Sequence, residues 1–173
     1  MLSKLLALTA AAGALAAPAP QTQAAPPEQI LPPGYEGPWK WEVTGWEAGC
    51  GRQYCSYNFN VSVPAIKGQT HYGQYYCNGY ENGPYGFDNF YAPCKSIGGP
   101  SLEAAARFRR REGDAFPKVI EISVLTPGYE DKIHPYNFTA YGDVTYNSAV
   151  APPLDFDVYP TVWQQLPYPG KSN

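Results

Sequence analysis

Apolar and polar residues alternate along much of the chain from residue 39 onward, and a period of two predicts β-strands. In 39–46 (WKWEVTGW), two tryptophans and a valine alternate with charged and polar residues. In 57–63 (YNFNVSV), aromatic and β-branched residues alternate with Asn and Ser until Pro64 ends the run. Each segment predicts a strand with one buried face and one solvent face. The connection between them, AGCGRQYC, contains two cysteines.

Other segments with a strand-like pattern are 70–77, 104–111, 118–125, 137–145 and 154–162. A helix remains an alternative for 101–112, because Ser101 can cap a helix and the Ala, Glu and Arg residues favour one. The strand is favoured because residues 104–111 could then pair with 118–125 in a β-hairpin. Segment 78–100 is rich in Asn, Gly, Pro and Tyr, which predicts a long loop. With about seven to eight short strands, we expect an all-β fold, either a small antiparallel β-barrel or a β-sandwich.

The two ends of the chain predict segments outside this fold. Residues 1–16 resemble a secretory signal peptide, with Lys4, an apolar run and the cleavage pattern Ala-Leu-Ala. The run is shorter than the roughly 20 apolar residues of a membrane span, so we expect no membrane anchor. Residues 17–38 are rich in Pro and Ala and predict an extended, disordered arm. A single β domain is expected over 39–163, followed by a flexible tail over 164–173.

Composition supports a secreted protein of strands and loops. The chain has 15 Tyr, 7 Phe and 4 Trp residues together with 17 Gly and 19 Pro. Aromatic residues favour strands, and Gly and Pro favour turns. The net charge of −3 at pH 7 gives no electrostatic basis for binding nucleic acid.

Four cysteines, Cys50, Cys55, Cys77 and Cys94, lie in the expected mature chain. An even number of cysteines in an exported protein indicates two disulfides, and three connectivities are open. The pairs Cys50–Cys55 and Cys77–Cys94 are favoured because both close short local loops. Zinc is disfavoured because no CxxC spacing occurs, so no metal or cofactor is expected.

Two sequons and one basic cluster are candidate surface features. Asn60-Val61-Ser62 and Asn137-Phe138-Thr139 fit the N-glycosylation motif, and we favour Asn137 slightly. The basic cluster consists of Arg107, Arg109, Arg110 and Arg111. It fits an anionic surface, but charged residues on a solvated edge strand are the favoured interpretation.

Aromatic residues gather around the loop that Cys77 and Cys94 would close. They are Tyr72, Tyr75, Tyr76, Tyr80, Tyr85, Phe87, Phe90 and Tyr91. If exposed, Tyr80, Tyr85, Phe87 and Tyr91 form a candidate partner surface, because exposed aromatics anchor partners and stack on sugars. A local cluster packed on the disulfide is the alternative and the favoured interpretation.

Catalytic signatures are weak in this sequence, and we expect a protein without enzymatic activity. Asp155 and Asp157 would lie on one face of a strand, about 7 Å apart. Two carboxyls at such a distance suit glycoside hydrolysis, but any Asp-x-Asp on a strand has this geometry. His71 and His134 are the only histidines, and no motif surrounds a nucleophilic serine.

The run WKWEVTGWEAGCGRQYCSYNFNVSVP, from residue 39 to 64, resembles the opening of small fungal secreted proteins described as hypersensitive-response-inducing elicitors. The likeness consists of an aromatic strand, GWEAGC, a second cysteine and the strand YNFNVS. A more remote similarity is to the Alternaria major-allergen-like family of secreted β-barrels. The resemblance implies a fungal effector that plant cells perceive and answer with defence or hypersensitive cell death. It carries no active-site residues.

Two functional hypotheses follow from these observations. The first is a secreted elicitor that binds a host plant protein or another cell-surface component. The second is a secreted carbohydrate-binding or cell-wall-active protein that uses its tyrosines on a cell-wall polysaccharide. A groove with paired carboxylates and exposed coplanar aromatics would favour the second, whereas buried aromatics and no cleft would favour the first.

Overall fold

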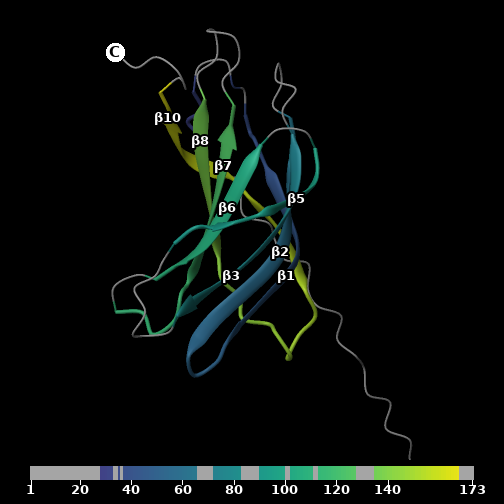
Figure 1. Ribbon diagram of the computed structural model, residues 1–173, viewed down its shortest axis with the longest axis vertical. Coiled ribbons are helices and arrows are strands. Elements are labelled where there is room, and N and C mark those ends of the chain that lie inside the picture. The colour runs from purple at the N-terminus through teal and green to yellow at the C-terminus, as the bar shows by residue number, and fades with distance from the viewer. Residues whose placement is uncertain are drawn as a thin grey trace, which may run out of the picture.

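The computed structural model describes residues 28–32, 35, 37–65, 72–82, 90–99, 102–110, 113–127 and 135–167. Within them the protein is all-β and contains no helix (Figure 1). The strands are β1 (Trp41–Cys50), β2 (Tyr54–Val63), β3 (Gly73–Asn82), β4 (Ala92–Pro93), β5 (Lys95–Gly98), β6 (Glu103–Arg109), β7 (Val119–Thr126), β8 (Tyr136–Asp143), β9 (Leu154–Val158) and β10 (Pro160–Gln165). The expected signal peptide lies outside the described residues.

The strands form two five-stranded sheets in which neighbouring strands are antiparallel. Sheet A has the order β5-β3-β2-β1-β9, and sheet B has the order β10-β8-β7-β6-β4. β2 and β3 pair over their whole length, from Tyr54 opposite Asn82 to Val63 opposite Gly73. In sheet B, β6 and β8 pair with β7 on its two sides. The segment 101–112, left between helix and strand by its sequence, therefore contains the strand β6.

At two places, between β4 and β5 and between β9 and β10, the chain turns a corner and consecutive strands belong to different sheets. The prediction of one strand over 154–162 was wrong, because β9 belongs to sheet A and β10 to sheet B. Pro160 begins β10 at the edge of sheet B, where its missing N–H costs no ladder hydrogen bond. The predicted loop 78–100 was also wrong in part, because β3 continues to Asn82 and β4 and β5 follow on either side of Cys94. These extra elements raise the strand count in the described residues to ten.

A β-bulge in β1 explains why this strand runs beyond its predicted end. The register to β2 shifts between Thr44 and Glu47, where Gly45 adopts a φ of 64°. A positive φ is easily reached by glycine and marks one class of bulge. The extra residue shifts the alternation by one position. Trp41 and Val43 point into the core before the bulge, and Trp46 and Ala48 do so after it.

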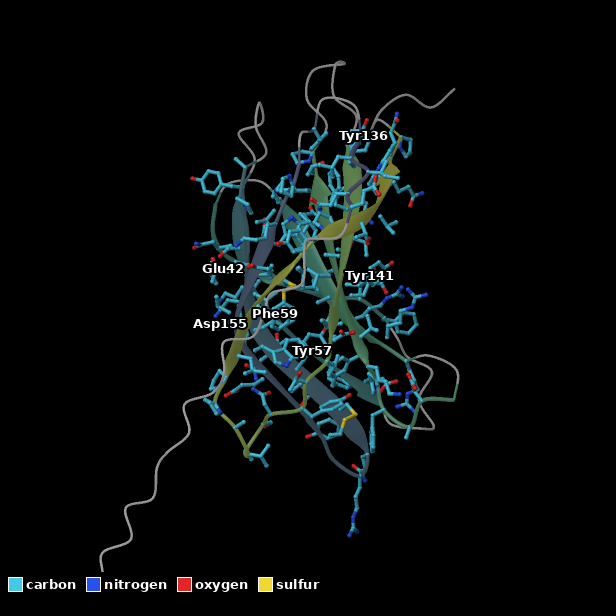
Figure 2. The ribbon with its side chains drawn as sticks, turned by 180° about the vertical axis from the view of Figure 1, so that it is seen from behind. Glu42, Tyr57, Phe59, Tyr136, Tyr141 and Asp155 are labelled. Atoms are coloured by element: carbon cyan, nitrogen blue, oxygen red, sulfur yellow. A yellow bond between two sulfur atoms is a disulfide. The ribbon has the colours of Figure 1, made fainter. Side chains whose placement is uncertain are left out.

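The inner faces of both sheets share one hydrophobic core, which is rich in buried aromatic residues. Trp41, Trp46, Phe59 and Phe138 are fully buried. The Trp39 ring lies edge-on to Phe138 with their centroids 4.8 Å apart. Figure 2 shows Tyr57 and Phe59 between the sheets, Glu42 and Asp155 on the outside of sheet A, and Tyr141 on the outside of sheet B. The core is therefore an aromatic layer between two sheets.

Two tyrosines of sheet A reach across this layer to the backbone of β6 and of the residue before it. The hydroxyl of Tyr57 donates to the Ala106 carbonyl at 2.7 Å, and that of Tyr75 donates to the Leu102 carbonyl at 2.8 Å. Tyr57 lies opposite Gly79 in the register, and a Cβ atom there would collide with its ring. Burial raises the pKa of Tyr75 to about 12, and it also raises the pKa of Tyr57.

Some residues of the expected arm pack on the folded domain, and some residues of the expected tail belong to its last strand. The Gln29 side chain donates to the carbonyls of Trp39 and Pro160 and accepts from the Trp39 amide. The Tyr35 ring lies 5.2 Å from Phe138 between centroids. Gln164 and Gln165, which the sequence placed in a flexible tail, belong to β10. Residues 17–27 and 168–173 lie outside the described residues.

The disulfides join Cys50 to Cys55 and Cys77 to Cys94, the two pairs that loop length favoured. The first links opposite residues at the end of the β1–β2 hairpin. The second ties β3 of sheet A to the corner between β4 and β5. It therefore fixes the point at which the chain changes sheets.

Removing the corner disulfide is expected to destabilise the protein more than removing the hairpin disulfide. The double variant Cys77→Ser/Cys94→Ser should lose about 3 kcal/mol of unfolding free energy, because the bridge closes the longer loop. Cys50→Ser/Cys55→Ser should lose less. Urea titrations of both variants measure the difference, and equal midpoints would contradict this account.

Gly79→Ala is expected to reduce the unfolding free energy by about 1–3 kcal/mol, because its Cβ atom would collide with the Tyr57 ring. Gly51→Ala serves as the matched control, since a Cβ atom at Gly51 meets only ordinary van der Waals contacts. Thermal and urea unfolding of the two variants tests the prediction. A Gly79→Ala protein as stable as Gly51→Ala would show that the inner tyrosine does not depend on this glycine.

Candidate functional site

The outer face of sheet A carries polar residues and three exposed tyrosines. On β2 the outward positions alternate with the buried ones and are Tyr54, Ser56, Asn58, Asn60 and Ser62. On β3 they are Gln74, Tyr76, Asn78 and Tyr80. We name the part of this surface made by Tyr54, Ser56, Asn58, Tyr76, Asn78 and Tyr80 the tyrosine face.

The register of β2 and β3 brings these side chains together in rows. Ser56 lies opposite Tyr80, and Asn58 lies opposite Asn78. Directly opposed residues on one face of a sheet are close enough to act on the same ligand. Tyr80, Tyr54 and Tyr76 are 67%, 51% and 38% exposed. The Tyr54 and Tyr80 rings are 6.4 Å apart at an interplanar angle of 71°, so they are not coplanar.

The side chains of the tyrosine face surround a shallow hollow of about 460 Å³. Tyr54 and Tyr80 line one end and Tyr76 the other, while Ser56, Asn58 and Asn78 lie between them. The Asn58 amide donates to the Glu47 carboxylate of β1 at 3.3 Å. The hollow thus combines aromatic rings at its ends with hydroxyl and amide groups between them.

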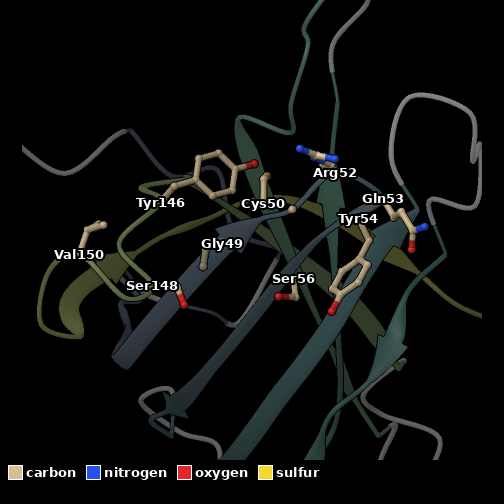
Figure 3. Close-up of a pocket in the computed structure, with 11 residues that line it drawn as sticks. Gly49, Cys50, Arg52, Gln53, Tyr54, Ser56, Tyr146, Ser148 and Val150 are labelled. Atoms are coloured by element: carbon tan, nitrogen blue, oxygen red, sulfur yellow. The ribbon is translucent and has the colours of Figure 1, made fainter.

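A second hollow, of about 750 Å³, adjoins the first and shares Tyr54 and Ser56 with it (Figure 3). It continues over Gly49, which lies opposite Ser56, to Ser148 and Val150 in the loop before β9. Gly49 has no side chain and Ser56 has a small one, so little side-chain bulk stands above the backbone at this cross-strand pair. The two hollows together cross β3, β2 and β1.

The loop that lines the second hollow is held by Asn147, which is buried. Its side-chain oxygen accepts from the Ala48 amide at 3.0 Å, and its nitrogen donates to the carbonyls of Trp46 and Pro152. Two of these bonds reach the backbone of β1, so the loop is tied to this strand. Ser148 and Val150 are therefore presented by an anchored segment.

The carboxylates considered for hydrolysis are engaged in other contacts. Asp155 accepts a hydrogen bond from the Gly45 amide at 2.8 Å, where it stabilises the bulge of β1. Asp157 pairs with Lys40 at 3.2 Å. Neither lines the two hollows. His71 and His134 lie outside the described residues.

The predicted partner surface does not form one patch in the described residues. Tyr80 belongs to the outer face of sheet A. The Tyr91 hydroxyl instead donates to Glu121 at 2.7 Å, and Glu121 lies on β7 of sheet B. Tyr85 and Phe87 lie outside the residues that the structure describes. Sequence reasoning missed Tyr54 as part of the site and treated Tyr76 only as a member of the wider aromatic cluster.

Two arginines of the basic cluster pair with buried glutamates. Arg107 Nε donates to Glu121 at 2.8 Å, and its guanidinium lies 4.3 Å from the Tyr91 ring centroid. Arg110 makes two hydrogen bonds to Glu81. β6 pairs with β7 along its length but with β4 only at Ala105 and Ala106, so at Arg107 and Arg109 the other side of β6 has no strand partner among the described residues. Arg111 lies outside the described residues.

The pKa of Glu121 is set by opposing effects. Burial alone would raise this pKa. Hydrogen bonds from Arg107 and Tyr91 and the charge of Arg107 outweigh burial, so the pKa lies below its ordinary value of 4.5. A carboxylate held in this way contributes to stability when it is ionised.

The two sequons lie on opposite outer faces. Asn60, on β2, lies opposite Thr44 on one side and Tyr76 on the other, next to the tyrosine face. Asn137, on β8, accepts a hydrogen bond from the Ser123 hydroxyl at 2.6 Å. Whether either is glycosylated stays a prediction.

Comparison with known proteins identifies no relative: no family model, curated protein or solved structure matches this chain. Two disulfides are compatible with an extracellular protein. Within the described ranges, no helix is long and apolar enough to cross a membrane. In the same ranges, no group of three His, Cys, Asp or Glu residues is placed to hold a metal ion.

Stability is expected to fall in acid partly through Glu121. Because its pKa is lowered by folding, its contribution is complete above pH 4.5 and is lost as the pH falls through the folded pKa. Glu121→Gln should therefore be less stable than wild type at pH 7 and lose less stability between pH 4.5 and pH 2. Urea midpoints across this range test it, with the exposed Glu103→Gln as control. A parallel loss in wild type and Glu121→Gln would refute the assignment.

Proposed function

We propose that the protein is a fungal extracellular binding protein, released at the plant surface, that plant cells perceive and answer with defence or hypersensitive cell death. It acts by binding a host component rather than by catalysis. The resemblance of residues 39–64 to secreted elicitors supports this role, as do the signal-like residues 1–16 and the two disulfides. The binding surface is the tyrosine face.

The observation that carries the proposal is the exposure of Tyr54, Tyr76 and Tyr80 on one face of a hydrogen-bonded sheet. Tyr57 and Tyr75, on the same strands, point inward and are buried. Exposed tyrosines on a rigid scaffold are suited to binding, because little conformational entropy is lost when they are covered. Tyrosine is also among the residues that contribute most at interfaces.

The contacts of the acidic residues also favour binding over hydrolysis. Asp155 and Asp157 are held by the Gly45 amide and by Lys40. A glycosidase needs two carboxyls facing each other across the bound sugar. The outer side of β9 uses both carboxylates to hold β1 and its neighbours.

A carbohydrate-binding role is the second candidate, and one observation favours it. The hollow between Tyr76 and Tyr80 is lined with the hydroxyl and amide groups of Ser56, Asn58 and Asn78. Few convergent polar groups beside aromatic rings are typical of small-ligand sites. The two roles are compatible, because a secreted protein can bind a wall polymer and be perceived there.

Infiltration of purified protein into leaves tests the proposed function. Wild type at micromolar concentration should produce an oxidative burst and ion leakage, and Tyr54→Ala/Tyr80→Ala should produce at most about a tenth of the response, because both anchors are removed. Tyr141→Ala, at a tyrosine on the outside of sheet B, is the control and should act like wild type. Circular dichroism should show that all three are folded. No response to wild type, or an undiminished response to the double variant, would overturn the proposal.

A further inference from the structure

We propose that the tyrosine face binds an extended, uncharged β-1,4-linked glucan, whose sugar rings stack on Tyr76 and Tyr80 and hydrogen-bond to the groups between them. The inference rests on the proposed function only in taking this face as the binding surface. It adds the chemical class of the ligand, which follows from the spacing, polarity and charge of the face.

The spacing of the tyrosines fits a chain of sugars rather than a single ring. Tyr76 and Tyr80 are four residues apart on β3, which places their Cα atoms about 13 Å apart along a straight strand. The two rings thus mark the ends of a site longer than one pyranose. A β-1,4-linked glucan is an extended ribbon with apolar ring faces, so it can follow the strand and contact both tyrosines.

The groups between the tyrosines suit a ligand that is rich in hydroxyls. Asn58 and Asn78 form one cross-strand row, and Ser56 faces Tyr80 in the next. Amide and hydroxyl groups both donate and accept hydrogen bonds. The Glu47 carboxylate beside Asn58 adds an acceptor. Sugar hydroxyls can satisfy each of these groups when they displace water.

The tyrosine face itself carries no charge. The outward residues of β2 and β3 with described side chains are uncharged, and the neighbouring strands carry both signs, with Glu42 and Glu47 on β1 and Lys95 opposite Tyr76 on β5. A polyuronate would therefore find no basic side chain within the face to pair with. Arg52 is the one basic residue that lines either hollow among the described residues. An uncharged ligand needs no such partner.

The second hollow gives the glucan a route across the sheet. Tyr80 lies opposite Ser56, and Ser56 lies opposite Gly49. Beyond Gly49 the second hollow is lined by Ser148 and Val150. A Cβ atom at Gly49 would lie 3.0 Å from the Ser148 Cβ atom, so a larger residue would narrow this passage. Longer oligosaccharides should therefore bind more tightly than short ones, and Gly49→Val should remove that gain.

Calorimetric titration with cellohexaose tests the inference directly. Wild type should bind, and Tyr80→Ala should weaken binding at least about tenfold, since aromatic anchors dominate such sites. Tyr141→Ala is the matched control, because this tyrosine lies on the outside of sheet B and lines neither hollow. Its affinity should stay within about twofold of wild type, a change under 0.5 kcal/mol.

Two further ligands test whether the site prefers an uncharged β-1,4-linked glucan. Polygalacturonate should bind more weakly than cellohexaose, and chitohexaose, which carries acetamido groups, should do so as well. The titrations are repeated with Ser62→Ala, which removes the Asn60 sequon, so that an attached glycan cannot cover the face. No binding of cellohexaose in either form, tighter binding of one of the other polymers, or unchanged binding by Tyr80→Ala would overturn the inference.

The two experiments distinguish a wrong ligand from a wrong proposed function. If cellohexaose does not bind but Tyr54→Ala/Tyr80→Ala still loses the leaf response, the glucan is wrong and the binding surface stands. If cellohexaose binds through Tyr80 but the leaf response does not depend on it, the elicitor role of this face is wrong and the glucan site stands.

Discussion

The architecture depends on two tyrosines that cross the core and end on backbone carbonyls. Tyr57 passes over Gly79 to reach Ala106, and Tyr75 reaches Leu102. A tyrosine hydroxyl buried without a partner would be unfavourable, so these bonds fix how the sheets face each other. They also fix which residues point outward, because side chains alternate along a strand. With Tyr57 inside, Ser56 and Asn58 must lie outside, and the candidate site follows from the core.

Much of this fold could be predicted from alternation alone. Segments such as 57–63 and 118–125 are long enough for a clear period of two, and β2 and β7 contain them. The strands β4 and β5 have only two and four residues, too few to show a period. The corner after Val158 was missed because alternation continues through it. The change of sheet is decided by pairing with β1 and β8, which are distant in sequence.

The candidate site was only partly visible in the sequence for a similar reason. Loop length was sufficient to favour the two disulfides, since both are local. The grouping of Tyr80 with Tyr91 was wrong because the chain between them leaves sheet A for sheet B. Tyr54 and Tyr76 belong to the site through strand pairing. A usable signal was present: Tyr54 is an aromatic residue on the polar side of an alternating strand.

The corners have a consequence for strand addition at the sheet edges. The four edge strands are two consecutive pairs in the chain, β4 with β5 and β9 with β10. Growing fibrils attach to a protein by adding an extended strand to an open edge. Here each edge strand is short and bends away at its corner into the other sheet, and the β4–β5 corner is held by the Cys77–Cys94 disulfide. The path of the backbone thus limits the addition of further strands to these four edge strands.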